Sequence, residues 1–267
     1  MPDVLTNGVR LVYERTGSGE PVLLIMGSGA AGRVWTVHQT PALHRAGYET
    51  VTFDNRGIPP SDVPAGQYSL ADMVADTRGL IEELGLAPCR IVATSLGSLI
   101  AQQLAVEAPE LVHCAVLLAT RGRSDVTRRA LARAERALAT SGLQLPDAYR
   151  AVKTVLEMLS PATLNRDTDV ASWLEVFELS GGRGAGGRGQ SWVDLPEDHL
   201  TALRGVTTPC RVIAFPDDLI SPPYLAAEVA TAIPNCDYVV VPDCGHLGHL
   251  ERPDDVNRTI IEFLDKY

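Results

Sequence analysis

The heptapeptide Ile-Val-Ala-Thr-Ser-Leu-Gly at residues 91–97 constrains the fold of this chain more than any other segment. Its apolar and β-branched start indicates a buried strand, and residues 98–105 are helix formers with apolar side chains spaced at i, i+3 and i+4. Ser95 therefore lies on a sharp turn between a strand and a helix, beside the small residues Ala93 and Gly97. A serine in this context is typical of a nucleophile elbow, where small neighbours permit strained backbone angles.

An acid and a histidine follow Ser95 in the chain order that is typical of a serine on such an elbow. The apolar run 211–215 is a predicted strand, and the loop after it carries Asp217 and Asp218. A second strand at 238–241 precedes a loop that carries His246. Both loops would lie at the carboxyl ends of parallel strands, where open α/β sheets place their sites. A histidine can take the hydroxyl proton of the serine, and an acid on its other nitrogen orients the ring.

Strands and helices alternate along the chain, which predicts a mostly parallel sheet covered by helices on both faces. Strands are expected near 9–14, 21–26, 49–53, 89–93, 114–119, 210–215 and 237–241. Helices are expected near 34–46, 69–84, 96–107, 223–231 and 253–266. Between the fifth and sixth of these strands, about ninety residues have no strand pattern but helical patterns near 131–138, 149–159 and 170–178. The chain is long enough to bury one large α/β core.

Several motifs resemble those of the α/β-hydrolase fold superfamily over nearly the whole chain. Residues 23–29 resemble its oxyanion loop, 53–62 its Asp-x-Arg-Gly turn, and Gly245-His246 with Glu251-Arg252-Pro253 its histidine loop. Together with residues 118–123, they most resemble an actinobacterial branch. That branch includes chloroperoxidase-like proteins, aclacinomycin methylesterase-like esterases and polyketide-tailoring relatives of antibiotic biosynthesis.

The resemblance implies a doubly wound sheet with a helical cap inserted after the sixth strand. The core would comprise residues 1–122 and 205–267, and the cap residues 123–204.

The resemblance also implies roles for single residues. Ser95, His246 and Asp218 would form a catalytic triad, with Asp217 as the alternative acid. The backbone amides of Ser28 and Leu96 would stabilise an oxyanion. No cofactor is implied, and the turn that contains Asp54 and Arg56 would be structural.

Large apolar residues of the insertion and of the oxyanion loop are candidates for substrate binding. For the residues of the insertion, the alternative is that they pack the cap onto its own small core. These candidates are Met26, Met158, Trp173, Phe177 and Trp192.

Charge and cysteine content exclude several other classes. A net charge of −10 argues against nucleic-acid binding, which depends on Lys and Arg at phosphates. The basic residues between Arg121 and Arg136 are interleaved with acids and are interpreted as a solvated helix face. The five scattered cysteines suggest reduced thiols rather than a zinc site or disulfides, and Cys244 is interpreted as a small loop residue.

No metal site is expected, because nothing in the sequence adds a third ligand to His246 and His249. The glycine-rich run Gly181–Gly189 lacks the features of a phosphate loop and is interpreted as a flexible hinge or lid. The N-terminus lacks a secretory signal pattern and no apolar run is long enough for a membrane span, so a cytoplasmic protein is expected.

The sequence therefore predicts a cofactor-free serine hydrolase acting on a carboxylic ester, lactone or thioester of a small molecule or natural-product scaffold. Three alternatives remain open on the same residues. They are a polyketide-tailoring lyase that eliminates a carboxylate such as acetate, a perhydrolase or haloperoxidase, and a ligand receptor that retains the triad. A homo-oligomer is compatible with the sequence.

Overall fold

The computed structural model of this chain describes residues 1–180 and 185–267. The strands are β1 (Asp3–Thr6), β2 (Val9–Gly17), β3 (Glu20–Ile25), β4 (Tyr48–Phe53), β5 (Cys89–Thr94), β6 (Val112–Leu118), β7 (Cys210–Ala214) and β8 (Cys236–Val240). The helices of the core are α1 (Gln39–Arg45), α2 (Leu70–Glu83), α3 (Leu96–Glu107), α10 (Pro223–Ala232), α11 (Gly248–Glu251) and α12 (Pro253–Leu264). Short 3₁₀ helices are η1 (Gly32–Val37), η2 (Pro109–Leu111) and η3 (Leu203–Gly205).

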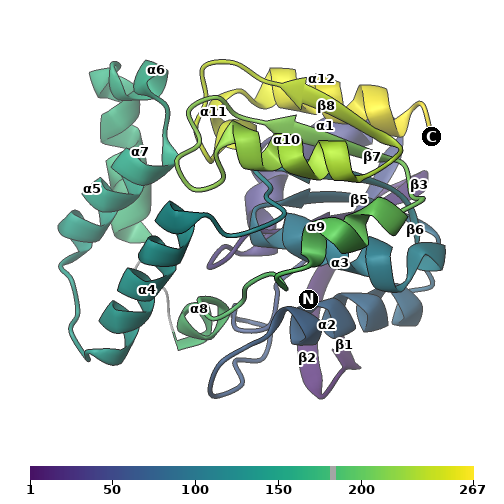
Figure 1. Cartoon of the computed structure of the whole chain (residues 1–267), viewed down its shortest axis with the longest axis horizontal. Coiled ribbons are helices and arrows are strands. Elements are labelled where there is room, and N and C mark those ends of the chain that lie inside the picture. The colour runs from purple at the N-terminus through teal and green to yellow at the C-terminus, as the bar shows by residue number, and fades with distance from the viewer. Residues whose placement is uncertain (181–184) are drawn as a thin grey trace.

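The strands form one sheet in the order β1-β2-β4-β3-β5-β6-β7-β8. Strands β3 to β8 are parallel to their neighbours among themselves, and β2 pairs antiparallel with both β1 and β4. Figure 1 shows α2 and α3 on one face of the sheet and α1 and α12 on the other. The predicted fold class, a mostly parallel sheet wound on both faces, is confirmed.

Alternating side chains of the central strands divide the core into two layers. In β3, Leu23 and Ile25 belong to the apolar cluster that includes α2 and α3. Val22 and Leu24, which point to the opposite face, belong to the cluster that includes α1 and α12. All four side chains are fully buried, as expected for a strand covered on both faces.

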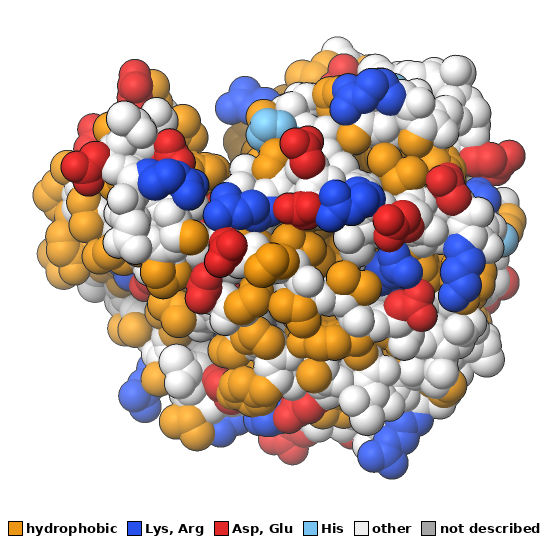
Figure 2. Space-filling view, turned by 90° about the horizontal axis from the view of Figure 1, so that it is seen from above, with side chains coloured by type: hydrophobic (Ala, Val, Ile, Leu, Met, Phe, Trp, Pro, Cys, Tyr) orange, Lys and Arg blue, Asp and Glu red, His pale blue; other side chains and the backbone are white. Residues whose placement is uncertain are grey.

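Helices α4 to α9 lie between β6 and β7, in the stretch where the sequence predicts an insertion at residues 123–204; its role as a cap domain is a proposal. They are α4 (Val126–Thr140), α5 (Asp147–Met158), α6 (Pro161–Leu164), α7 (Asp167–Leu179), α8 (Ala185–Gln190) and α9 (His199–Ala202). Figures 1 and 2 show α4 to α7 as a lobe beside the sheet, with a notch between lobe and core. Of the predicted hinge or lid at Gly181–Gly189, positions 181–184 lie outside the described residues. The rest of that run belongs to α8.

Two local elements differ from the sequence-based expectation. Strand β1 was not predicted, although Asn7-Gly8 is a hairpin signal, and both residues have positive φ (48° and 73°). The helix expected at 34–46 is divided into η1 and α1 at His38. Pro41 explains the break, because it has no N–H to donate to the carbonyl of Val37 and its ring would clash there.

The start of α3 packs directly on the backbone of β3. A Cβ atom placed on Gly97 would lie 2.2 Å from the carbonyl oxygen of Ile25, so glycine is required at this close approach. On the other side, the amide of Ser95 donates a hydrogen bond of 3.0 Å to the carbonyl of Leu118, at the end of β6. The turn at Ser95 is therefore held between two strands.

Besides His246, two histidines are buried in the folded chain. His249 packs against Trp35 with ring centroids 5.2 Å apart, and His199 Nε2 lies 3.0 Å from Gln102 Oε1. Desolvation lowers the pKa of His249 to about 3, helped by the nearby His246 and His38. Desolvation also lowers the pKa of His199 to about 4, with a further contribution from Arg121. Both rings are therefore neutral near pH 7.

The free energy of unfolding should decrease as the pH falls from about 6.5 to about 4. In that window the unfolded chain binds protons on His199 and His249 that the folded chain excludes. His249→Phe retains an aromatic ring beside Trp35 and should reduce the loss between pH 6 and pH 4 by roughly 2 kcal/mol. Chemical denaturation at several pH values measures this.

His113→Phe, which replaces an exposed histidine, is the matched control and should follow the wild-type curve. An unchanged pH dependence in His249→Phe would show that His249 is not the buried neutral ring described above.

Candidate active site

Ser95 occupies a strained turn between β5 and α3. Its backbone angles are φ 53° and ψ −118°, a region that side-chain-bearing residues rarely adopt. The turn directs the side chain away from the sheet, and Ser95 Oγ lies 3.0 Å from His246 Nε2. This is hydrogen-bond distance for proton transfer from the hydroxyl to the ring.

Asp218 lies on the opposite side of the His246 ring. Nδ1 of His246 is 2.8 Å from Asp218 Oδ2 and 2.9 Å from Oδ1, and the Asp218 side chain is fully buried. Oδ1 also accepts hydrogen bonds of 2.8 Å from the amides of Ile220 and Ser221. The loop after β7 thus holds the carboxylate in place, and a carboxylate at Nδ1 leaves Nε2 free to accept a proton.

The structure brings together three of the residues selected from the sequence, Ser95, Asp218 and His246. Asp217, the alternative acid, is half-buried, and its amide donates to the carbonyl of Cys244 at 3.2 Å. The geometry therefore favours Asp218 as the partner of His246.

The two expected oxyanion donors line the cavity at Ser95. Leu96 is the first residue of α3, where the amides of the first turn have no partner within the helix. Ser28 lies on the loop after β3, and a Cβ atom placed on the neighbouring Gly27 would be 3.2 Å from Ser95 Cβ. Both residues therefore lie beside Ser95, and the role of their backbone amides as oxyanion donors is a proposal.

Gln190, at the end of α8, fastens the loop that carries Ser28. Its Oε1 accepts hydrogen bonds from the amide of Gly29 (2.8 Å) and from Ser28 Oγ (3.2 Å). Its Nε2 donates to the carbonyl of Arg56 at 2.8 Å. Sequence reasoning missed this residue, because no local pattern relates a glutamine of the insertion to a loop more than 150 positions earlier.

The turn after β4 braces the same loop from the other side. Asp54 Oδ1 accepts from the amide of Gly32 at 2.8 Å, and Asn55 Nδ2 donates to the carbonyl of Met26 at 3.2 Å. Arg56 forms a buried ion pair with Asp76 of α2, with Nε to Oδ2 at 2.5 Å. These contacts match the structural role expected for Asp54 and Arg56.

Glu251 connects the histidine loop to the insertion. Oε2 accepts from the amide of Gly245 at 2.6 Å, while Oε1 accepts from the amide and the hydroxyl of Ser160 at 2.9 and 2.8 Å. A Cβ atom on Gly245 would lie 2.6 Å from the carbonyl oxygen of Met158, so the two segments pack closely. The Glu251 carboxylate thereby positions the loop that presents His246.

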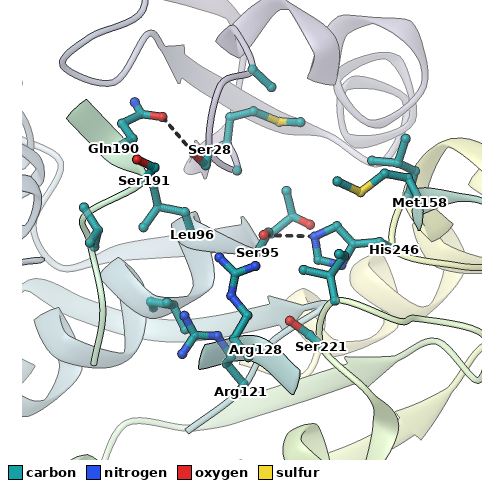
Figure 3. Close-up of a pocket in the computed structure, with 18 of the residues that line it drawn as sticks. Ser28, Ser95, Leu96, Arg121, Arg128, Met158, Gln190, Ser191, Ser221 and His246 are labelled. Atoms are coloured by element: carbon teal, nitrogen blue, oxygen red, sulfur yellow. Dashed lines mark hydrogen bonds between the residues drawn. The ribbon is translucent and has the colours of Figure 1, made fainter. Parts of the chain in front are cut away.

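Ser95 opens into a cavity of about 130 Å³ between the core and the insertion (Figure 3). Met26 and Met158 line it, and the contact of these two side chains with substrate remains a proposal.

The other three substrate-binding candidates are not among its lining residues. Trp173 and Phe177 stack on each other within α7 at 5.5 Å, and the Trp192 ring lies 4.8 Å from the Arg136 guanidinium. These three side chains serve packing contacts of the insertion.

Arg121 and Arg128 line this cavity, contrary to the interpretation of residues 121–136 as a solvated helix face. Arg121 is buried and precedes α4, while Arg128 lies in the first turn of that helix and faces inward. The interpretation failed for these two residues because charge alternation in a sequence does not reveal which side of a helix faces the core. Other basic residues of this run, such as Arg129 and Arg133, are exposed as expected.

Within residues 1–180 and 185–267, no group of three or more His, Cys, Asp or Glu side chains could hold a metal ion. Burial raises the pKa of the Cys244 thiol to about 12, which keeps it protonated and leaves it a weak nucleophile. In the same part of the chain, no helix has the length and apolar character needed to cross a membrane.

Comparison with known proteins gives consistent matches. The family described as alpha/beta hydrolase fold matches residues 20–253. A Mycobacterium tuberculosis H37Rv protein named as the non-heme bromoperoxidase BpoC is 46% identical over 257 residues, which cover 96% of this chain and 98% of the relative. Its crystal structure has a TM-score of 0.92 to this chain, covering 96% of each. A thermophilic esterase from Thermogutta terrifontis has a TM-score of 0.84 at 25% identity, covering 99% of this chain and 98% of that one.

Proposed function

The chain belongs to the α/β-hydrolase fold family, and on this basis we propose that it is a serine hydrolase that cleaves a carboxylic ester, lactone or thioester through an acyl-enzyme. The observation that carries the proposal is the hydrogen-bonded series Ser95 Oγ–His246 Nε2 (3.0 Å) and His246 Nδ1–Asp218 Oδ2 (2.8 Å). It ends in a cavity next to two candidate oxyanion donors. In this proposal, Ser95 is the nucleophile, His246 the base and Asp218 the orienting acid.

The first half of the reaction forms the acyl-enzyme. As Ser95 Oγ attacks the carbonyl carbon, its proton moves to His246 Nε2, and the carbonyl oxygen becomes an anion. The amides of Ser28 and Leu96 stabilise this anion, and the Asp218 carboxylate stabilises the imidazolium. His246 then donates the proton to the leaving oxygen or sulfur, and the bond from that atom to the acyl carbon breaks.

The second half releases the acid. His246 removes a proton from water as the water oxygen attacks the acyl carbon, and the Ser95 oxygen leaves with the proton returned from His246. All proton transfers use groups of the chain itself, so the proposal needs no cofactor.

Substrate choice is proposed to lie in residues 123–204, acting as a cap over the core formed by residues 1–122 and 205–267. Met158, at the end of α5, lines the cavity from the insertion, and Met26 lines it from the core. Their thioether side chains would contact the acyl or alcohol part of a small substrate. The cavity volume supports a small molecule, because a cavity of roughly 150 Å³ in another protein holds a benzene molecule.

A second candidate function is perhydrolysis, which the 46% identity to a protein named as a bromoperoxidase favours. Hydrogen peroxide would replace water as the nucleophile on the acyl-enzyme, giving a peracid and free Ser95. The peracid would then oxidise bromide to hypobromite and be reduced to the carboxylate. The same three side chains and the same oxyanion donors serve both reactions.

Substitution of Ser95 and of the two adjacent aspartates tests the proposed roles. Ser95→Ala should lower the rate of p-nitrophenyl ester hydrolysis by a factor on the order of 10³ or more. Asp218→Asn should lower the same rate by roughly 10⁴, as the equivalent change does in a serine protease, because the amide favours the wrong tautomer of His246. Asp217→Asn is the matched control and should cost less than about tenfold.

Circular dichroism would show that each variant is folded, and a fluorophosphonate probe should label wild-type Ser95 but not Ser95→Ala. Near wild-type turnover in folded Ser95→Ala would refute the assignment, and the reverse ranking of the two aspartates would move the acid to position 217.

Isotope labelling distinguishes hydrolysis from elimination. If water resolves an acyl-enzyme, reaction in ¹⁸O-labelled water must place the label in the released acid, because solvent attacks the acyl carbon. Direct elimination breaks the alkyl–oxygen bond instead, so the carboxylate keeps both original oxygens and the other product gains a double bond. Mass spectrometry of the acid is expected to show the label. An unlabelled acid together with an alkene would replace the hydrolase proposal by a lyase.

The perhydrolase candidate predicts bromination that depends on both carboxylate and peroxide. With acetate, hydrogen peroxide and bromide present, the wild-type protein should brominate a phenolic dye, and Ser95→Ala should not. Omission of acetate should abolish the reaction, since no peracid can form. Bromination that persists in Ser95→Ala would contradict this candidate.

A further inference from the structure

The wall of the cavity next to Ser95 carries two guanidinium groups. Arg121 follows β6 and Arg128 belongs to the first turn of α4, and both line the cavity with Ser95 and Ser221. Figure 3 shows the two arginines together on one wall, across the cavity from Ser28 and Met158. The proposed reaction mechanism uses neither of them.

Arg121 is buried with few of its donors satisfied. Its side chain is 7% exposed, and Nη1 donates to Ser124 Oγ at 3.0 Å and to Asp194 Oδ1 at 3.3 Å. Among residues 1–180 and 185–267, no group accepts a hydrogen bond from its Nη2 or Nε. Neither atom is among the fully buried side-chain atoms without a partner, so these remaining donors reach the cavity that Arg121 lines. A ligand with an acceptor group could pair with them there.

Arg128 adds a second cation beside the first. Its Nη2 lies 3.9 Å from Glu135 Oε2, which is longer than a hydrogen bond, and its side chain is 19% exposed. Burial lowers the pKa of Arg121, and the charge of Arg128 lowers it further, against the opposing effect of Asp194. The two positive charges therefore repel each other inside the cavity.

We infer that Arg121 and Arg128 form a subsite for a carboxylate of the substrate, so that the substrates are esters, lactones or thioesters that carry a free carboxylate near the scissile bond. This inference rests on the proposed function and narrows its substrate class. A bound carboxylate would accept hydrogen bonds from donors of both guanidiniums and relieve their repulsion. A single carboxylate fits better than a multiply charged group, because Asp194 and Glu135 already neutralise part of the charge.

The subsite is a positively charged region within an acidic chain. With a net charge of −10 the molecule repels anions at long range, and the two guanidiniums in the cavity wall create a local field of the opposite sign. An anionic substrate is therefore attracted at the site, and a neutral substrate of the same shape leaves both arginines without their partner. Discrimination against the neutral analogue follows, since unpaired buried donors are costly.

Two matched pairs of esters test the inference. The first pair places the charge in the acyl part, with mono-p-nitrophenyl glutarate against p-nitrophenyl pentanoate. The second places it in the alcohol part, with p-carboxyphenyl pentanoate against p-carbamoylphenyl pentanoate. Wild type should have the higher kcat/KM for the anionic member of at least one pair. Arg128→Gln should lower that ratio by about tenfold or more, the range of one charge-assisted hydrogen bond.

Arg133→Gln is the matched control, because Arg133 is an exposed arginine of the same helix and is not among the residues that line the cavity. It should keep the wild-type ratio within about twofold. Because the Arg128 side chain is less deeply buried than that of Arg121, its replacement should disturb the fold less, and circular dichroism would show that Arg128→Gln is folded. Hydrolysis of both pairs with no preference for the anion would overturn the subsite and leave the proposed function intact.

Binding without turnover separates the two proposals. In the Ser95→Ala background, calorimetry should show that monomethyl glutarate binds more tightly than dimethyl glutarate, and Arg128→Gln should abolish the difference. If this binding is found while wild type hydrolyses none of the esters, the subsite stands and the hydrolase proposal fails. Equal binding of the two probes in the Ser95→Ala background would overturn the subsite, whatever the hydrolytic activity.

Discussion

The left-handed backbone of Ser95 is the constraint on which the rest of the site depends. A φ of 53° at a serine is unfavourable, and the turn persists because its amide is bonded to the carbonyl of Leu118 while Gly97 lets α3 approach the backbone of β3. The same turn places Ser95 Oγ at the carboxyl edge of the sheet and the Leu96 amide at the start of a helix. The proposed nucleophile and one proposed oxyanion donor are thus placed by a single close contact between a helix and a strand.

The site is completed by two connections between the core and the insertion. Gln190 holds the loop that carries Ser28, and Glu251 holds the histidine loop against Ser160. Gln190 is buried and Glu251 is half-buried, so the hydrogen bonds of these polar groups would be costly to lose. A displacement of the insertion would therefore change the oxyanion loop and the position of His246 together, which couples the shape of the cavity to the geometry of the reacting groups.

The arginine pair in the cavity is opposite in sign to the net charge of the chain. The chain is strongly acidic, yet its cavity presents Arg121 and Arg128, and the buried His199 and His249 remain neutral because desolvation opposes their protonation. Family membership leaves the substrate open, since the same fold and the same three side chains serve many reactions. The walls of the cavity, and the arginine pair in particular, are where this chain would select its substrate.

The sequence by itself determined the fold class and the grouping of Ser95 and His246 with an acid of the loop after β7, because each rests on a local pattern: a strand, a turn or loop, and a chain order at one edge of a parallel sheet. The contact with His246 in the structure then favoured Asp218 over Asp217. Strand β1 also has a local signal in the sequence, because Asn7-Gly8 is typical of a hairpin turn. Tertiary structure alone decided which side chains of the insertion reach the cavity. Trp173, Phe177 and Trp192 pack elsewhere, while Arg121, Arg128 and Gln190 face the site. The physical reason is that these contacts join segments far apart in the chain, and the direction in which a helix presents its side chains is set by packing between elements rather than by its own periodicity.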